Sequence, residues 1–303
     1  MSRPYCIRGF TLLEMIVVIT LTGIIAFLVS RNIVRPVEGF IDLTTRAGLV
    51  DGAELALRRM SRELRLALPN SVRISGGSLC SAPGGGAVCA VEILRTLDGG
   101  RYRALPDGTA GPCGTPGDDK ISFAQPTDCF EIMGVLNSVP QDGGASQADC
   151  LTGVADCLVI FNTGQNGANA WLGQNIAAIQ SSDPDGNGAM DSILFTGAPP
   201  FPLRSPRQRF HIVDMPVSYV CDTGAGSITR QADYTIAGIQ LDNPNPPGDI
   251  LAENVTGCSF TYADGTNSRN GLLTLDITFT RVDTQGIPNR VRLVEQIPVP
   301  NIP

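Results

Sequence analysis

Oxygen-bearing residues in the stretch SSDPDGNGAMDSIL have the spacing of a calcium-binding loop. Counted along a twelve-residue loop, the candidate ligands at positions 1, 3, 5, 7 and 9 are Asp183, Asp185, Asn187, the carbonyl of Ala189, and Asp191. Calcium takes about six to eight oxygen ligands, and such loops place a glycine at position 6, where the chain has Gly188. Position 12 should be a bidentate glutamate but is Leu194. The pattern predicts a structural calcium site that needs a further ligand from elsewhere, with a metal-free polar turn as the alternative.

His211 is the only histidine, and it could act as a general base only beside a nucleophile or an acid. It lies in the strand-like segment RFHIVD, near Arg209 and Asp214, so we expect a structural or surface residue. Neither a G-x-S-x-G motif nor a Walker or Rossmann glycine pattern occurs, and the glycine-rich SAPGGGAVC leads into no predicted helix. Acidic residues are spread along the chain, but nothing marks two of them as a catalytic pair. The sequence therefore favours a protein that is not an enzyme.

Glu14 is the only charged residue in the apolar run of twenty residues from Phe10 to Val29. About twenty apolar residues span the ~30 Å hydrocarbon core of a bilayer, so the run predicts a membrane helix. A carboxylate at the bilayer centre costs at least ~2.5 kcal/mol and implies a functional partner. A secretory signal would have a shorter apolar core and a small-residue cleavage site, and Phe27–Asn32 is a poor one. A plain single-pass anchor would explain the length of the run but not Glu14.

A second helical pattern follows the apolar run and ends at Pro69. Its apolar positions recur every three to four residues, as on one face of a helix, and they are Leu49, Ala53, Ala56, Leu57, Met60, Leu64, Ala67 and Leu68. Arginines crowd the other positions, and Glu54 stands four residues before Arg58, which is a favourable spacing. Pro36 should bend or interrupt the helix. We expect the apolar face to pack against a following sheet.

Beyond Pro69 the pattern changes to strands and turns. The segment VEILRTLDGGRYRAL predicts a hairpin about Asp98-Gly99-Gly100, a favoured turn sequence. Further strands are predicted in KISFA, FEIMGVL, LVIFNTG, RFHIVDMPVSYVCD, SITRQADYTI and SFTYADG, with a closing hairpin of LLTLDITFTRV and NRVRLVEQIPVP. The elements predict an α+β fold, in which a long N-terminal helix packs on an antiparallel sheet with a large disulfide-pinned insertion over residues 104–200. Two β subdomains, split between residues 165 and 205, are the alternative.

The N-terminal residues resemble the type IV prepilin family, in which a short basic leader ending in glycine is followed by F-T-L-x-E and a hydrophobic helix. Here the leader is MSRPYCIRG, and it is followed by Phe10-Thr11-Leu12-Leu13-Glu14. The resemblance implies that a prepilin peptidase cuts between Gly9 and Phe10 and methylates the new amino group of Phe10. It also implies that Glu14 pairs with this amino group on a neighbouring subunit and so sets axial register. The expected segments are a leader (1–9), a transmembrane helix (10–30), an amphipathic helix (31–69) and a β-rich head (70–303).

The chain has nine cysteines, and loss of the leader would remove Cys6 and leave eight for four disulfides. We predict sequential pairing, which joins Cys80 to Cys89, Cys113 to Cys129, Cys150 to Cys157, and Cys221 to Cys258. Zinc is the alternative, but no C-x-x-C pair occurs and there is only one histidine. Disulfides imply an oxidising compartment, so the head is expected in the periplasm or outside the cell.

The stretches ALRRMSRELRLALPNSVR and RFHIVDMPVSYVCD, with the cysteine-bearing middle, resemble the O-type minor pilins of the mannose-sensitive haemagglutinin (MSHA) pilus. This resemblance implies a non-catalytic subunit at or near the filament tip. It would be a single-pass protein of the inner membrane of a Gram-negative bacterium, with a periplasmic head that later reaches the cell surface. The implied partners are other major and minor pilins, the prepilin peptidase and the pilus assembly platform. A minor pseudopilin of type II secretion is the nearest alternative, although the large tip pseudopilin of that system typically lacks the carboxylate that Glu14 supplies.

Charge and aromatic residues bear on the remaining alternatives. The side chains sum to 22 − 29 = −7, and no Lys/Arg-rich stretch follows the helix, so nucleic acid is not an expected partner. A tip adhesin or binding module, with a head that contacts a surface glycan or another minor pilin, is a second functional hypothesis, and the long insertion at residues 104–200 motivates it. Trp171, Phe201 and Phe210 could form an exposed patch for such a ligand, although aromatic residues are more often part of a core. Apart from the calcium site, no cofactor is expected.

Overall fold

The computed structural model describes residues 10–75, 88–105, 111, 113, 120–123, 128–196, 201–240, 248–265, 269–283 and 286–301. The chain divides into two compact units. The first unit is Met1–Asp51 with Val282–Asn289, and the second is Gly52–Arg281 with Arg290–Pro303. We call the second unit the head.

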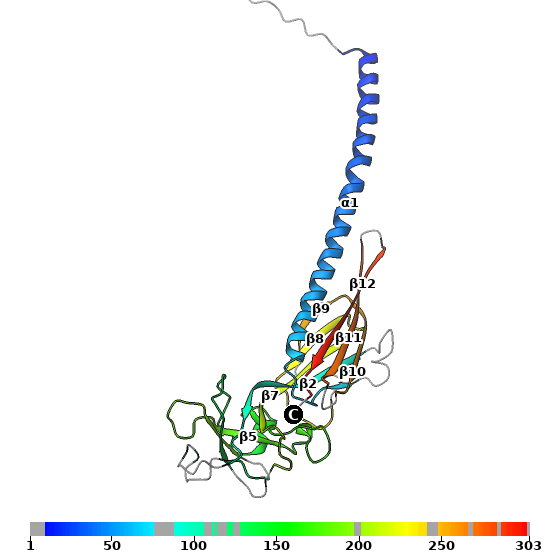
Figure 1. The fold of residues 1–303 in the computed structure, drawn as a ribbon. Coiled ribbons are helices and arrows are strands. Elements are labelled where there is room, and N and C mark those ends of the chain that lie inside the picture. The colour runs from blue at the N-terminus through cyan, green and yellow to red at the C-terminus, as the bar shows by residue number, and fades with distance from the viewer. Residues whose placement is uncertain are drawn as a thin grey trace, which may run out of the picture. The chain divides into compact units, whose positions relative to one another are not determined.

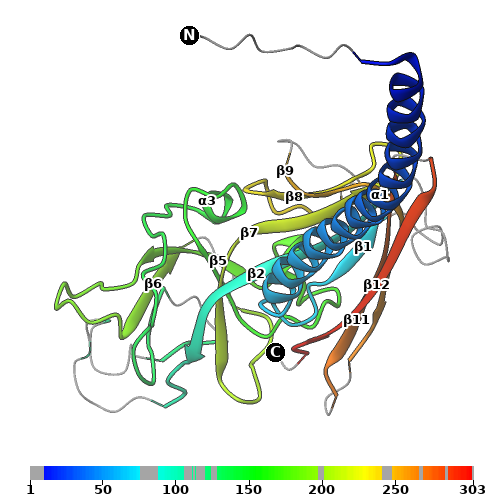
Figure 2. The ribbon, with the colours of Figure 1, turned by 90° about the horizontal axis from the view of Figure 1, so that it is seen from above.

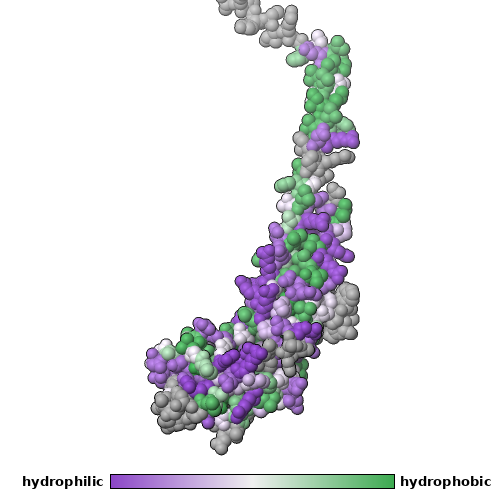
Figure 3. Space-filling view, viewed as in Figure 1, coloured by the Kyte–Doolittle hydropathy of each residue, from purple (hydrophilic) through white to green (hydrophobic). Residues whose placement is uncertain are grey.

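Helix α1 (Leu12–Leu64) begins in the first unit, and its last turns belong to the head. Its segment Leu12–Asn32 has a mean hydropathy of 2.6, is long and apolar enough to cross a membrane, and is not buried. On the face shown in Figure 3, apolar residues cover this part of the helix. The hydroxyl of Thr20 donates to the carbonyl of Ile16 at 2.9 Å, so its polar group is satisfied within the helix, as a lipid environment requires.

Pro36 was predicted to bend or interrupt the helix, and the interruption is wrong because α1 is continuous through this residue. A bend at Pro36 stays a prediction. A proline inside a helix removes one backbone hydrogen bond and crowds the carbonyl four residues earlier. The long helical runs on both sides of Pro36 maintain the helix in spite of that loss.

The head is built on two antiparallel sheets, as predicted for an α+β fold. Within the described residues the larger sheet has nine strands: β1 (Arg73–Ser75), β2 (Val88–Arg101), β3 (Cys129–Glu131), β4 (Cys157–Val159), β5 (Ile176–Ser181), β6 (Ser192–Thr196), β7 (Arg209–Asp222), β8 (Ser227–Ala232) and β9 (Asp249–Glu253). The smaller sheet has β10 (Val255–Ala263), β11 (Gly271–Val282) and β12 (Pro288–Val299). Two short helices are α3 (Gln147–Leu151) and η1 (Ala170–Leu172).

Strand β7 is the centre of the larger sheet (Figure 1). Strand β2 pairs along one side of it, from Val88 opposite Asp222 to Arg101 opposite Arg209. The other side of β7 pairs with β4 near its start and with β8 near its end. One branch of the sheet continues from β4 through β5 and β6 to β3, and the other continues from β8 to β9. The insertion is therefore anchored on the same strand as the rest of the head.

The last turns of α1 bury the apolar face that the sequence predicted, and its residues are Ala53, Ala56, Leu57, Met60 and Leu64. Figure 2 shows this end of α1 crossing in front of β2. The helix was expected to reach the proline at position 69 but ends at Leu64. The next backbone groups bond to β2 instead, because Thr96 N donates to Leu66 O at 2.7 Å and Leu68 N donates to Leu94 O at 2.8 Å.

The hairpin predicted about Asp98-Gly99-Gly100 is wrong, because β2 runs through these residues without a turn. Gly99 pairs with His211 and Gly100 pairs with Phe210 on β7. A Cβ on Gly99 would lie 2.8 Å from the carbonyl oxygen of Phe210, and one on Gly100 would lie 2.9 Å from its ring. The two glycines therefore permit a close approach between strands, which is another common reason for glycine in a strand.

The predicted strands agree unevenly with the structure. RFHIVDMPVSYVCD is β7, and the closing hairpin is β11 with β12, so both predictions are confirmed. The strand predicted in KISFA is absent from its described residues Lys120–Phe123, and the one in FEIMGVL is limited to Cys129–Glu131. These two segments lie in the loop-rich insertion, where hydrophobic residues serve the core without regular pairing.

Two of the apolar clusters of the head lie on opposite faces of the larger sheet. Ile212 and Val213 are neighbours on β7 but belong to different clusters, as expected when side chains alternate along a strand. Phe201 and Phe210 lie in the first cluster and Trp171 in the second. All three aromatic residues are buried, so they form core and not an exposed ligand patch.

Three disulfides within the described residues join the pairs expected from the sequence: Cys113 with Cys129, Cys150 with Cys157, and Cys221 with Cys258. The last joins β7 to β10 and so links the two sheets. Cys89 is also disulfide-bonded. Its expected partner, Cys80, lies outside the described residues, as do Cys6 and Gly9.

Candidate functional site

An exposed carboxylate stands in the first turn of α1. The hydroxyl of Thr11 accepts a hydrogen bond from the backbone N–H of Glu14 at 3.3 Å, which is an N-cap contact at the spacing of a capping box. The carboxylate of Glu14 is exposed and makes no hydrogen bond or ion pair within the described residues. Phe10, immediately before the cap, is exposed as well. The carboxylate is therefore available to a cation of another molecule.

A charged clamp holds the end of α1 against the larger sheet. Glu63 accepts hydrogen bonds from the hydroxyl of Tyr219 on β7 at 2.5 Å and from the guanidinium of Arg230 on β8 at 2.8 Å. We call these three residues the Glu63 clamp. Burial alone would raise the pKa of Glu63, but the bonds from Arg230 and Tyr219 outweigh it and lower the pKa. The clamp therefore holds a carboxylate in its ionised form between one helix and two strands.

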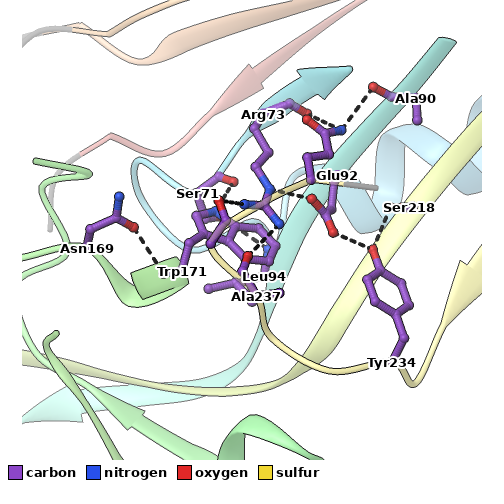
Figure 4. Close-up of polar contacts among 12 residues, drawn as sticks. Ser71, Arg73, Ala90, Glu92, Leu94, Asn169, Trp171, Ser218, Tyr234 and Ala237 are labelled. Atoms are coloured by element: carbon purple, nitrogen blue, oxygen red, sulfur yellow. Dashed lines mark hydrogen bonds and ion pairs between the residues drawn. The ribbon is translucent and has the colours of Figure 1, made fainter. Parts of the chain in front are cut away.

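A second polar group surrounds Arg73 on β1 (Figure 4). The guanidinium forms an ion pair with Glu92 on β2, whose side chain is only 1% exposed. It also lies 3.6 Å from the centroid of the Trp171 ring, a cation–π arrangement. Tyr234 donates its hydroxyl to Glu92 at 2.7 Å and contacts the hydroxyl of Ser218 at 2.5 Å. We call these five residues the Arg73 cluster.

The Arg73 cluster connects segments that are far apart in the sequence. Arg73 donates to the backbone carbonyls of Ala237 at 2.9 Å and Gly238 at 3.1 Å. The indole N–H of Trp171, in η1 of the insertion, donates to the carbonyl of Ser71 at 2.9 Å. The cluster thus ties the insertion to the first strands of the sheet and to the segment after β8. The cluster and the clamp both join separate elements of the fold, so both groups brace the head.

The predicted calcium loop is held by bonds of its own. Asp183 accepts hydrogen bonds from the backbone N–H groups of Asn187 at 3.1 Å and Gly188 at 2.9 Å. The side-chain amide of Asn187 donates a hydrogen bond to Asp185 at 2.8 Å. These bonds suit a polar turn and also leave carboxylate lone pairs open. Among the described residues, no group of three or more His, Cys, Asp or Glu side chains is placed to hold an ion. Calcium at Asp183, Asp185, Asn187, Ala189 and Asp191 stays a prediction.

The single histidine lies on β7 of the larger sheet, and no described acid or nucleophile bonds to its ring. Burial lowers the pKa of His211 to about 4, and the charge of Arg209 lowers it further. Its Nε2 atom is buried without a hydrogen bond. A buried, neutral imidazole suits the structural role that the sequence predicted for His211.

Asp156, before β4, is a buried carboxyl with an unusual pKa. Its Oδ2 accepts the backbone N–H of Gln141 at 2.7 Å. Burial raises its pKa to about 6, the bond from Gln141 opposes this shift, and the charge of Asp214 adds to it. A carboxyl whose pKa is higher in the folded state than in the unfolded chain stabilises the fold least when it is ionised. The head should therefore lose stability as the pH rises from about 4, the ordinary aspartate value, through about 6.

We expect Asp156→Asn to stabilise the head at about pH 8 by on the order of 1–2 kcal/mol, because the variant has no carboxyl to ionise. The gain should shrink towards zero at about pH 4, and thermal unfolding at both pH values measures it. Asp276→Asn is the matched control, because the bond from Arg292 lowers the pKa of Asp276. This variant should lower the stability of the head at about pH 8, where Asp156→Asn raises it. A gain for Asp156→Asn that does not change with pH would contradict this account.

Comparison with known proteins bears on the N-terminal segment. Residues 6–30 match a family model described as the prokaryotic N-terminal methylation motif. No curated protein and no solved structure matches the chain. The matched residues include Gly9, Phe10 and Glu14, and they support a type IV pilin or pseudopilin that is anchored in a membrane. The motif implies processing by a prepilin peptidase and assembly with other pilins, and it points to a structural protein.

Proposed function

We propose that the chain is a minor pilin of a type IV pilus of the MSHA type, a non-catalytic subunit that acts at or near the filament tip. One coincidence carries the proposal: the methylation motif, an apolar helix and an unpaired carboxylate occur in the same segment. A plain membrane anchor would need only the apolar helix.

In this role, the prepilin peptidase cuts between Gly9 and Phe10 and methylates the new amine of Phe10. The cut places a positive charge four residues before Glu14. The amine of one subunit then pairs with the Glu14 carboxylate of its neighbour. Because an unpaired charge in lipid costs at least ~2.5 kcal/mol, the pairing favours one axial register over the others.

The proposed location follows from the membrane segment and the disulfides. Leu12–Asn32 spans the inner membrane of a Gram-negative bacterium, and the head lies in the periplasm before assembly and on the cell surface afterwards. The three described disulfides support an oxidising compartment for the head.

The size and bracing of the head support a minor position in the filament. The insertion adds its own strands and apolar cluster to the sheet, and the Arg73 cluster fixes it in place. A large rigid head packs poorly in every position of a dense filament but is accommodated at the tip. There it meets other minor pilins, and the assembly platform at the membrane adds major pilins below it.

The proposal predicts a specific mass for the chain in sheared filaments. Residues 1–9 should be absent, one methyl group should be present, and reduction should add two hydrogens for each of four disulfides. Intact-mass measurement before and after reduction tests this, and labelling of the head by microscopy should place it at filament ends. An uncut chain that is confined to the membrane would overturn the proposal, and a processed chain absent from pili would favour a pseudopilin.

A further inference from the structure

A basic cavity lies in the head, away from the Glu63 clamp and the Arg73 cluster. Its volume is about 370 Å³, within the ~300–1,000 Å³ of typical small-molecule sites. Its lining includes Tyr102, Lys120 and Phe123 together with Arg204 and Gln208. We call it the Lys120 pocket.

Two cations line this pocket, and its described lining residues include no acidic one. Lys120 is the only lysine in the sequence, and Arg204 is the second cation of the lining. Within the described residues, neither cation forms an ion pair or a hydrogen bond, although Arg204 lies 5.4 Å from the centroid of the Phe123 ring. Such a site attracts an anion, although the net charge of the chain is −7.

Backbone and side-chain hydrogen bonds order the turn of Ser205–Gln208 that lines the pocket. Gln208 has a positive φ of 57°, a backbone conformation that is strained for a residue other than glycine. Its N–H donates to the carbonyl of Ser205 at 3.0 Å, and its carbonyl accepts the N–H of Tyr102 at 2.9 Å. The hydroxyl of Ser205 accepts the N–H of Arg209 at 3.1 Å. These bonds hold the turn in place, so a ligand would not have to order it.

A disulfide and an aromatic contact lie beside the lining residues Lys120 and Phe123. The disulfide between Cys113 and Cys129 closes the loop that carries Lys120 and Phe123. The ring of Phe123 lies 5.8 Å from that of Tyr102, and Tyr102 is buried. The pocket therefore offers an aromatic surface beside two cations.

We propose that the Lys120 pocket binds a carboxylate-bearing sugar. The apolar face of a sugar ring packs on an aromatic side chain such as Phe123, its hydroxyls suit the amide of Gln208, and its carboxylate suits Lys120 and Arg204. A neutral sugar would leave both cations unpaired. A nucleic acid would meet a chain of net negative charge. This binding activity goes beyond a structural role in a filament, and it does not depend on that role.

The test compares two sugars that differ only in the acid group. Titration calorimetry on the full chain in a neutral detergent uses D-galacturonic acid and D-galactose as probes. We expect galacturonate to bind at least about tenfold more tightly, and its affinity to fall about tenfold in Lys120→Gln and in Arg204→Gln. Arg292→Gln removes an exposed arginine of β12 and should leave the affinity unchanged. Equal binding of the two sugars, or no binding of galacturonate, would overturn the proposal.

A chemical readout on the unmodified chain avoids any loss of folding in the variants. Because Lys120 is the only lysine, acetic anhydride can acylate only one side-chain amine. We expect galacturonate to slow this acylation several-fold, as measured by mass spectrometry of the peptide, and galactose to have no effect. Unchanged acylation in saturating galacturonate would place the sugar elsewhere and contradict the assignment to this pocket.

Discussion

Glu14→Ala should leave the chain inserted in the membrane but lower its incorporation into filaments by on the order of tenfold to a hundredfold. The alanine variant keeps the apolar segment Leu12–Asn32, so insertion is unaffected. It loses the carboxylate that pairs with the amine of Phe10 on a neighbour, and that amine stays unpaired in lipid at a cost of at least ~2.5 kcal/mol. Quantitative immunoblots of membrane and sheared-filament fractions measure both effects.

Two further variants make this experiment specific to the charge. Glu14→Gln keeps the size of the side chain and should fail in the same way. Glu54→Gln removes another exposed glutamate of α1, which pairs with Arg58 in the head, and should assemble normally because exposed pairs of this spacing contribute only ~0.3–0.5 kcal/mol. Normal incorporation of Glu14→Ala would show that the carboxylate has no part in assembly.

Local patterns predicted the parts of the fold that depend on neighbouring residues. The buried face of α1 followed from helical spacing, and β7 followed from a long apolar and β-branched run. The helix end at Leu64 did not follow, because the groups after it bond to β2, more than twenty residues later in the sequence. The same reason explains the failed hairpin, since Gly99 and Gly100 serve contacts with Phe210 on another strand.

Sequence reasoning located the N-terminal carboxylate but missed the clamp and the cluster. Glu14 is visible because it is a lone charge in an apolar run. Glu63 looked like one charge among many on a polar helix face, and its partners Tyr219 and Arg230 lie in distant strands. A signal was present for Glu92, which interrupts the apolar stretch VCAVEIL, because a charge in a buried strand needs a partner. Nothing in the sequence identified Arg73 as that partner.

The Arg73 cluster should contribute the largest single-residue effect on the stability of the head. We expect Arg73→Met to lower the free energy of unfolding by about 3–5 kcal/mol, because it leaves the buried carboxylate of Glu92 without a counter-charge. Arg73→Lys should recover only part of this loss, since an ammonium cannot reproduce the planar contacts with Trp171 and the backbone carbonyls. Urea unfolding in a neutral detergent measures the change in free energy. The fluorescence of Trp171, the only tryptophan, follows the unfolding at the cluster itself.

A double variant separates the lost charge pair from a general packing defect. If the uncompensated charge of Glu92 causes most of the lost stability, then Arg73→Met with Glu92→Gln should be more stable than Arg73→Met alone. The glutamine has no charge, and its side-chain oxygen can still accept a hydrogen bond from the hydroxyl of Tyr234. Arg292→Met breaks the pair with Asp276, in which the arginine is 63% exposed, and should change stability by less than ~1 kcal/mol. A double variant no more stable than Arg73→Met would instead assign the loss to the contact with Trp171, and the insertion would then be held by that contact more than by the ion pair.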